Sequence, residues 1–249
     1  MITTLTRAAF AAAIAAPFAA LSPAPALAGD AARLNVLGFS ADASIFAFEE
    51  YGIQDGSGFP YANRFYIDTA TDTFLAGTPI RVRLDDEAAD VAQARAMARD
   101  QGEAIVGDDV LADNRGWLAG FNAVTERSAD PFVMTVNPRP VFPPIDDPIE
   151  VRLEELGFVA EDTCAGVVDT LAGFRLVAID PTPGGTTRLL HEDDRVPASR
   201  GCPLGYRIGG IQVADHPHGP DTYAVLIAVR SYGFEGPDHR WMAVTVTGP

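Results

Sequence analysis

The sequence contains no lysine, and its 18 basic residues are all arginine. The absence of lysine excludes Schiff-base chemistry and serine–lysine catalysis, because both need the lysine amine. Positive charge is also scarce, since 34 acidic residues give a formal net charge of −16 at pH 7. This balance argues against attraction to a nucleic-acid backbone or to anionic lipid, so we expect no nucleic-acid partner.

Contiguous catalytic motifs are absent as well. The sequence has no G-x-S-x-G elbow, no H-E-x-x-H, no P-loop and no G-x-G-x-x-G that opens a helix. The acidic clusters lack the ligand spacing of an EF-hand, and the pair His216 and His218 has no Cys or third His nearby. We therefore predict neither a cofactor nor a metal site. A catalytic triad assembled from distant residues stays open, because such a site depends on geometry.

Long hydrophobic runs are missing, and the one near the N-terminus has a different meaning. The run from Ala8 to Leu21 has 14 residues, fewer than the ~20 that a spanning helix needs. It follows Arg7 and is followed by Ala26-Leu27-Ala28, a small-x-small cleavage site. We therefore predict a signal peptide over residues 1–28, with a retained anchor as the alternative. After cleavage we expect a periplasmic or secreted protein without a membrane span.

Cysteine is nearly absent, with only Cys164 and Cys202 in the chain. Export into an oxidising compartment lets two such residues join, so we predict a disulfide between them. A bridge that closes 38 residues would stabilise the fold by roughly 4 kcal/mol in the loop-entropy model. Two separate buried thiols are the alternative, and neither cysteine has the local context of a catalytic thiol.

What the sequence does contain is a succession of strand-length segments. These are apolar, aromatic or β-branched and are separated by clusters of Gly, Pro and Asp, a pattern typical of antiparallel meanders. The fold class that we predict is α+β, mainly antiparallel β, with two β-meander lobes and one main helix. The expected strands cover residues 34–39, 45–51, 64–67, 73–75, 80–84, 149–153, 174–179, 187–191, 206–213, 223–232 and 241–246.

One segment has the period of a helix. Its apolar stripe consists of Val91, Ala94, Met97 and Ala98, with Gly102 as its end. Asp85 and Asp86 are expected to cap it, and a second helical turn is expected over 110–115. Six prolines between residues 131 and 148 exclude a helix or a central strand there. We therefore predict an N-terminal lobe over 29–130, a linker over 131–148 and a C-terminal lobe over 149–249.

The long loop from Gly52 to Asn63 is the main candidate for a binding site. Long loops between strands are often functional, and carboxylates beside aromatic residues suit a sugar, a peptide or a cation. A structured hairpin with its aromatic residues folded back is the alternative. Glu49 and Glu50 are neighbours on a strand, so they should point to opposite faces, one inward and one to water. The candidate ligand-binding residues are Glu49, Glu50, Tyr51, Phe59, Tyr61, Arg64 and Phe234.

Two stretches resemble known families. The segment Leu37-Gly38-Phe39-Ser40-Ala41-Asp42-Ala43 resembles the strand and turn of TolB-type β-propeller blades, although alanine replaces the proline and the glycine of that motif. The segments 49–62 and 233–238 resemble an uncharacterised family of predicted secreted bacterial proteins. The second resemblance implies an exported protein of unknown activity and supplies no catalytic residues.

Together these features predict an exported envelope protein that binds a partner without catalysis. The ligand would be a small molecule, a glycan or a periplasmic protein, bound by the loop after Tyr51. A hydrolase that acts on an envelope polymer, with Glu49 or Glu50 as acid or base, is one alternative. A structural component of a periplasmic assembly is the other.

Overall fold

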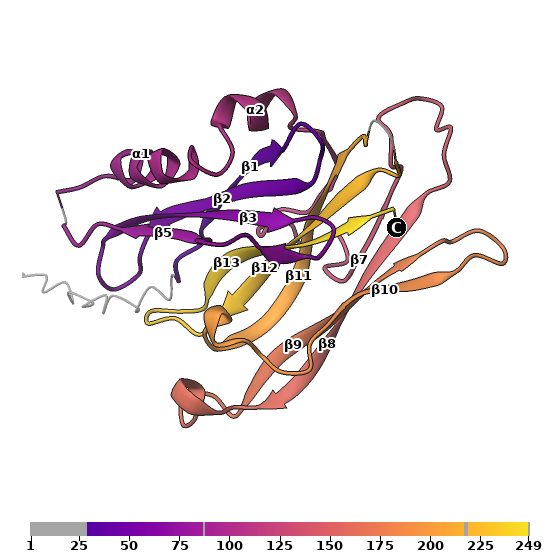
Figure 1. Cartoon of the computed structure of the whole chain (residues 1–249). Coiled ribbons are helices and arrows are strands. Elements are labelled where there is room, and N and C mark those ends of the chain that lie inside the picture. The colour runs from indigo at the N-terminus through magenta and orange to yellow at the C-terminus, as the bar shows by residue number, and fades with distance from the viewer. Residues whose placement is uncertain (1–28, 87, 217–218, 249) are drawn as a thin grey trace, which may run out of the picture.

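The structure is a computed structural model, and it describes residues 29–248 except 87, 217 and 218. The predicted signal peptide lies outside the described residues, as do Pro217 and His218. The fold class is confirmed, because the chain is mainly antiparallel β with one main helix. Its strands form three sheets rather than two meanders, and the helices cover an outer face of the first (Figure 1).

The first sheet is built from the N-terminal strands, in the order β1-β2-β3-β4, with β5 also paired to β3. The connections β1–β2, β2–β3 and β3–β4 are hairpins, as expected for strands separated by turn residues, whereas β5 returns to pair with β3. The strands are β1 (Arg33–Phe39), β2 (Ile45–Ile53), β3 (Pro60–Asp68), β4 (Thr73–Phe74) and β5 (Ile80–Arg83).

The other two sheets share the rest of the chain. The central sheet has the order β13-β12-β11-β6 and contains β6 (Trp117–Phe121), β11 (Pro203–Ala214), β12 (Thr222–Ser231) and β13 (Asp238–Thr247). The third sheet has the order β10-β9-β8-β7 and contains β7 (Val133–Val136), β8 (Ile149–Val159), β9 (Thr170–Ile179) and β10 (Thr187–Glu192).

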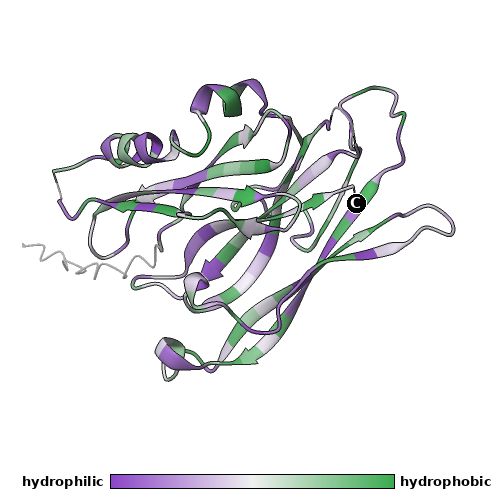
Figure 2. Cartoon of the chain, in the orientation of Figure 1, coloured by the Kyte–Doolittle hydropathy of each residue, from purple (hydrophilic) through white to green (hydrophobic). Residues whose placement is uncertain are grey.

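Three hydrophobic clusters join these elements into four layers. One lies between the helices and the first sheet, one between the first and central sheets, and one between the central and third sheets. Strand β12 is therefore buried on both faces, which explains the unbroken apolar run from Val225 to Val229. Figure 2 shows green, hydrophobic stretches along the strands of the stacked sheets, interrupted by white and purple positions, and α1 carries both green and purple.

Large and small side chains complement each other between the first and central sheets. The first sheet contributes Phe39, Phe46, Phe48 and Phe65, and the rings of Phe48 and Phe65 stack with their centroids 4.5 Å apart. The central sheet faces them mainly with alanines at 214, 224, 228 and 243. Because the alanines are short, the sheets can approach while the phenylalanine rings fill the space between them.

The main helix begins at a different residue from the one that the sequence predicts. Helix α1 (Val91–Gly102) has Asp90 as its N-cap, with its side chain bound to the N–H of Gln93. The Gln93 side chain accepts from the Asp90 N–H in return and completes a capping box. Asp85 instead pairs with Arg83, so the predicted cap at Asp85 and Asp86 is wrong. Helix α2 (Asp108–Asp113) corresponds to the second predicted turn.

Strands from the proline-rich segment and from the predicted N-terminal lobe pair with strands of the predicted C-terminal lobe. Strand β7 lies inside 131–148 and forms an edge of the third sheet. Strand β6 precedes the segment but pairs with β11, on the far side of the proposed linker. Neither strand was expected from the sequence. The division into two lobes remains a prediction, because the strand connectivity does not test it.

Candidate functional site

Glu49 and Glu50 lie side by side on β2 and point to opposite faces of the first sheet, as predicted. Glu49 binds Arg95 of the helix layer, whereas Glu50 binds Trp241 of the central sheet. The expectation that one of them faces water is wrong, because both are almost completely buried. The reason is that β2 is an inner strand whose two faces are both covered, which a single strand's alternation does not reveal.

Glu50 connects two sheets through both of its carboxylate oxygens. Its Oε1 accepts a hydrogen bond of 2.9 Å from the Asn63 side chain, and its Oε2 accepts one of 2.7 Å from the Trp241 N–H. Burial raises the pKa of Glu50 above its usual value of 4.5, although these two hydrogen bonds act in the opposite direction. The carboxylate is therefore a buried bridge between β2 and β13.

A second carboxylate repeats this arrangement four residues further along β13. Asp72 accepts hydrogen bonds from the N–H and the hydroxyl of Thr245, at 2.7 and 3.0 Å. Since β13 is an edge strand, the N–H groups of Trp241 and Thr245 point away from β12. Alternate residues of an antiparallel strand direct their N–H groups to the same side, so the N–H of Ala243 points that way too. Ala243 thus lies between two capped positions on the free edge of β13.

A cavity of about 650 Å³ opens beside this edge, and we call it the inter-sheet cavity. Its walls come from the first sheet, from β13 and from the segment 197–202 that precedes β11. Apolar side chains cover much of the wall, among them Phe65, Phe74, Pro197, Trp241 and Met242. Large, mainly apolar concavities with a few polar groups are the common form of a small-molecule site.

Three arginines line the inter-sheet cavity, and they differ in how they are neutralised. Arg240 pairs with Asp30 at 2.8 Å, and Arg200 pairs with Asp193 at 2.6 Å. Arg81 has no ion pair within the described part of the chain, and its guanidinium lies 5.7 Å from the centre of the Phe65 ring. Arg81 is exposed, so it offers a charge to whatever occupies the cavity.

A buried network supports the wall that contains Arg200. Asp193 accepts hydrogen bonds from Nε2 of His191, from the Arg200 guanidinium and from the Phe174 N–H, at 2.9, 2.6 and 2.9 Å. Burial acts to raise the pKa of Asp193, but these three hydrogen bonds outweigh it and lower the pKa to about 2. Asp193 is therefore a permanent carboxylate that holds β9, β10 and the 197–202 segment together.

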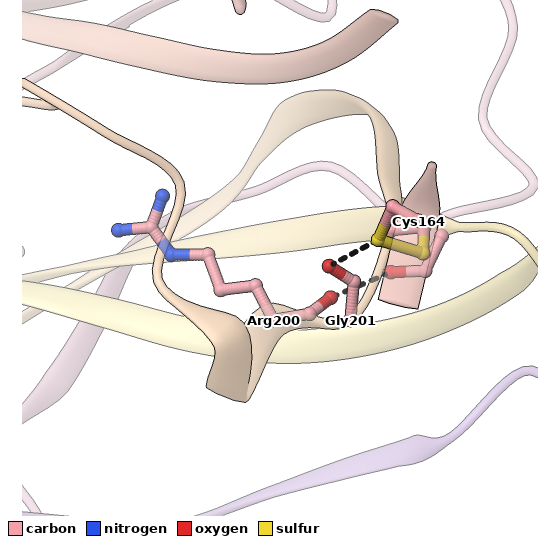
Figure 3. Close-up of a disulfide and its surroundings, with 5 residues drawn as sticks. Cys164, Arg200 and Gly201 are labelled. Atoms are coloured by element: carbon pink, nitrogen blue, oxygen red, sulfur yellow. Dashed lines mark hydrogen bonds between the residues drawn. A yellow bond between two sulfur atoms is a disulfide. The ribbon is translucent and has the colours of Figure 1, made fainter. Parts of the chain in front are cut away.

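The predicted disulfide is present and holds the same wall. Cys164 and Cys202 are joined, and Cys202 lines the inter-sheet cavity. Figure 3 shows the bridge beside Arg200 and Gly201, with the Cys164 sulfur 3.6 Å from the Gly201 carbonyl oxygen. The bridge ties the turn after β8 to the chain that leads into β11.

The structure divides the predicted binding residues into three places. Glu50 and Tyr61 face the central sheet, and Arg240 lies 4.9 Å from the centre of the Tyr61 ring. Glu49, Tyr51 and Arg64 lie on the helix side, where Arg95 stands 4.1 Å from the centre of the Tyr51 ring. Phe59 and Phe234 are in loops outside both faces, so only Glu50 of the predicted set lines the inter-sheet cavity.

The loop that these predictions relied on is shorter than expected. Strand β2 continues to Ile53 and β3 begins at Pro60, so residues 54–59 form the connection. The loop 232–237 contacts it, because the Glu235 N–H donates to Asp55 at 2.7 Å. Phe234 is 82% exposed and packs over Gly56. The two loops therefore form one rim, with the Phe234 ring on its outer surface.

Several cavity residues were missed from the sequence. Asp72 lies in a turn, Arg81 lies on a short strand, and Arg200, far from both in the chain, ends a short 3-10 helix. No local motif marks them. The unusual feature of Asp72 is its positive φ of 52°. This is a property of the folded backbone and could not be read from the sequence.

The fold and this site define a disulfide-bonded, layered β protein with an internal cavity. The model of the family described as "Predicted secreted protein (DUF2259)" matches residues 47–247, and the chain belongs to that family. The resemblance to a secreted family is thus confirmed, and the disulfide agrees with export. No curated protein matches the chain, and no solved structure matches it either.

The resemblance to a TolB-type propeller blade is not supported beyond the hairpin itself. The segment that carries it forms β1, a turn and the start of β2, and the turn is held by Ser40 and Asp42. These strands belong to a sheet stacked face to face on another sheet, whereas propeller blades are arranged radially around a channel. The shared residues encode a hairpin turn and not the higher architecture.

Two further observations concern the described residues alone. Within 29–248, without 87, 217 and 218, no helix has the length and apolar character to cross a membrane. In the same residues no three His, Cys, Asp or Glu side chains are grouped so that they could hold a metal ion.

Proposed function

We propose that this protein is a ligand-binding module of the cell envelope and that its ligand occupies the inter-sheet cavity. The ligand is a small molecule with an apolar body and one acidic or carbonyl group. The observation that carries this proposal is the combination of an apolar cavity, the edge of β13 at Ala243 and the exposed Arg81, which has no ion pair among the described residues, at one wall.

Each part of the cavity supports one part of the ligand. Phe65, Phe74 and Trp241 suit an apolar or aromatic body. The N–H of Ala243 suits a carbonyl or carboxylate oxygen, because Glu50 and Asp72 already occupy the flanking N–H groups of β13. Arg81 suits the negative charge of an acid.

The environment of Glu50 favours binding over hydrolysis. A general acid or base must reach the proton of its substrate within hydrogen-bond distance. Both oxygens of Glu50 instead accept hydrogen bonds from the protein itself. Glu50 therefore serves as a structural bridge in this proposal, and the hydrolase remains the competing function.

We expect Arg81→Gln to weaken the binding of anilinonaphthalene sulfonate about tenfold. The reason is that the variant loses the charge-assisted hydrogen bond between the Arg81 guanidinium and the sulfonate. This probe combines aromatic rings with one acidic group, and its affinity is measured by fluorescence titration. Arg83→Gln is the matched control, since Arg83 lies on the same face of β5 but does not line the cavity. Equal affinities for the two variants, or no saturable binding to the wild type, would contradict the proposal.

A function in the cell envelope is expected to require export and the removal of the predicted signal peptide, residues 1–28. The N–H of Asp30 donates to Asp238 at 2.9 Å, and the Asp30 carboxylate pairs with Arg240. Asp30, two residues after the predicted cleavage site, is thus held in the fold by residues of β13. We expect the intact mass of protein recovered from the periplasm or medium to correspond to a chain that starts at Gly29. A mass that retains residues 1–28 would refute cleavage.

A further inference from the structure

A second cavity lies on the opposite face of the first sheet, and we call it the helix-side cavity. It has a volume of about 430 Å³ and lies between the sheet and helices α1 and α2. It shares no lining residue with the inter-sheet cavity. Four arginines line it against two carboxylates, which is unusual in a chain of net charge −16. The lining charges are Arg64, Arg95, Arg99, Arg115, Glu49 and Asp108.

Glu49, at the base of this cavity, is satisfied on one oxygen only. Arg95 donates to Oε2 from Nη2 and Nε, at 2.8 and 3.2 Å, and Asn35 donates to the same oxygen at 3.3 Å. Oε1 is buried and has no hydrogen-bond partner in the described part of the chain. Oε2 of Glu49 thus accepts three hydrogen bonds, whereas Oε1 accepts none from the described residues.

Arg64 presents a complementary open position beside it. Its two terminal nitrogens form a bidentate pair with Asp108, at 2.6 and 2.9 Å. Its Nε is buried, lacks a hydrogen-bond acceptor among the described residues, and lies 3.9 Å from Oε1 of Glu49. The Arg64 side chain is 4% exposed and that of Glu49 is fully buried, so both positions are costly to leave unsatisfied.

A hydroxyl group satisfies both positions together. Its hydrogen can be donated to Oε1 of Glu49, and its oxygen can accept from the Nε–H of Arg64. An ammonium group cannot accept, and a carboxylate cannot donate, so neither fits both atoms. Of these three ligand groups, only a hydroxyl can contact Glu49 as a donor and Arg64 as an acceptor at once.

The remaining arginines select the charge of the ligand. Among the described residues, the Arg99 guanidinium has one ion pair, with the exposed Asp100 next to it at 3.3 Å. Arg115 has no ion pair in the described residues, although it lines the cavity and follows α2. Guanidinium groups with free donors bind carboxylate or phosphate oxygens well.

We propose that the helix-side cavity binds a small hydroxylated anion of the sugar-acid type. One hydroxyl of this ligand bridges Glu49 and Arg64, and its anionic group contacts Arg99 and Arg115. This site is separate from the inter-sheet cavity, and it stands whether or not that cavity binds a ligand.

The test compares three probes by isothermal titration calorimetry with the mature protein. D-gluconate carries hydroxyls and a carboxylate, propionate carries only the carboxylate, and D-glucose carries only hydroxyls. We expect gluconate to bind at least about tenfold more tightly than either of the other two. Equal affinities for gluconate and propionate, or no gluconate binding at about 10 mM, would overturn the proposal.

Variants assign the binding to this cavity. Arg115→Gln is exposed and unpaired in the described structure, so it should fold normally, and we expect about tenfold weaker gluconate binding. Arg81→Gln is the matched control and should leave gluconate binding unchanged, because Arg81 lines the other cavity. Glu49→Gln should abolish the preference for gluconate over propionate, since its amide would meet Arg64 as a donor. Unchanged binding in Arg115→Gln would place the anion elsewhere and refute the site.

Discussion

Replacement of both Cys164 and Cys202 by alanine should lower the free energy of unfolding by about 4 kcal/mol. The reason is that the bridge closes 38 residues and so restricts the unfolded chain. Unfolding in urea, followed by circular dichroism, measures this loss. The wild type in the presence of a reductant should approach the stability of the double variant, which serves as an internal control.

The same variant should also affect the inter-sheet cavity. Cys202 and its neighbours Arg200 and Gly201 form one wall, so this wall loses its covalent attachment to the turn at Cys164. We therefore expect weaker binding of anilinonaphthalene sulfonate, while gluconate binding in the helix-side cavity persists. A loss of stability below about 1 kcal/mol would show that the bridge adds little to the fold.

Asp193→Ala should destabilise the protein by about 3–5 kcal/mol, the usual effect of removing one partner of a buried ion pair. Arg200 would be left buried with its side chain 12% exposed, and the Phe174 N–H would lose its acceptor. Asp194→Ala is the matched control, because Asp194 is the next residue and is exposed. A similar midpoint of urea unfolding for both variants would refute the structural role of Asp193.

The pH dependence of this difference has a defined direction. The pKa of Asp193 is about 2 in the folded protein and 3.8 for an ordinary aspartate, so the folded state favours the carboxylate. Its contribution to stability is full above pH 3.8 and is lost as the pH falls toward 2. The gap in unfolding free energy between the wild type and Asp193→Ala should therefore narrow over that interval.

Most strands could be predicted from the sequence because their residue patterns are local. The disulfide could be predicted because an oxidising compartment favours it. The run from Val225 to Val229 and the hairpin turns carry their own pattern, and an exported chain with two cysteines has one pairing available. Strands β6 and β7 were not predicted, because they are short and gain their order from pairing with β11 and β8. The helix cap was assigned too early in the chain, since the partner that identifies Asp90 is Gln93, three residues further on.

The candidate site was harder to predict because it depends on which layers cover each face of a strand. Alternation correctly separated Glu49 from Glu50, but it could not show that helices cover one and a second sheet covers the other. Arg81, Asp72 and Arg200 meet only because the first sheet, β13 and the disulfide-linked segment converge. Such a site is a product of tertiary packing and leaves no contiguous motif.

The capping of β13 by Glu50 and Asp72 has a consequence for association between molecules. An edge strand with free N–H groups is a template onto which a strand of another copy can add. Here the buried carboxylate of Glu50 and the half-buried carboxylate of Asp72 accept from the N–H groups of Trp241 and Thr245, and the first sheet lies against that edge. An incoming strand would have to displace both carboxylates before it could extend the central sheet. We therefore expect Glu50 and Asp72 to disfavour edge-to-edge association of two copies through β13.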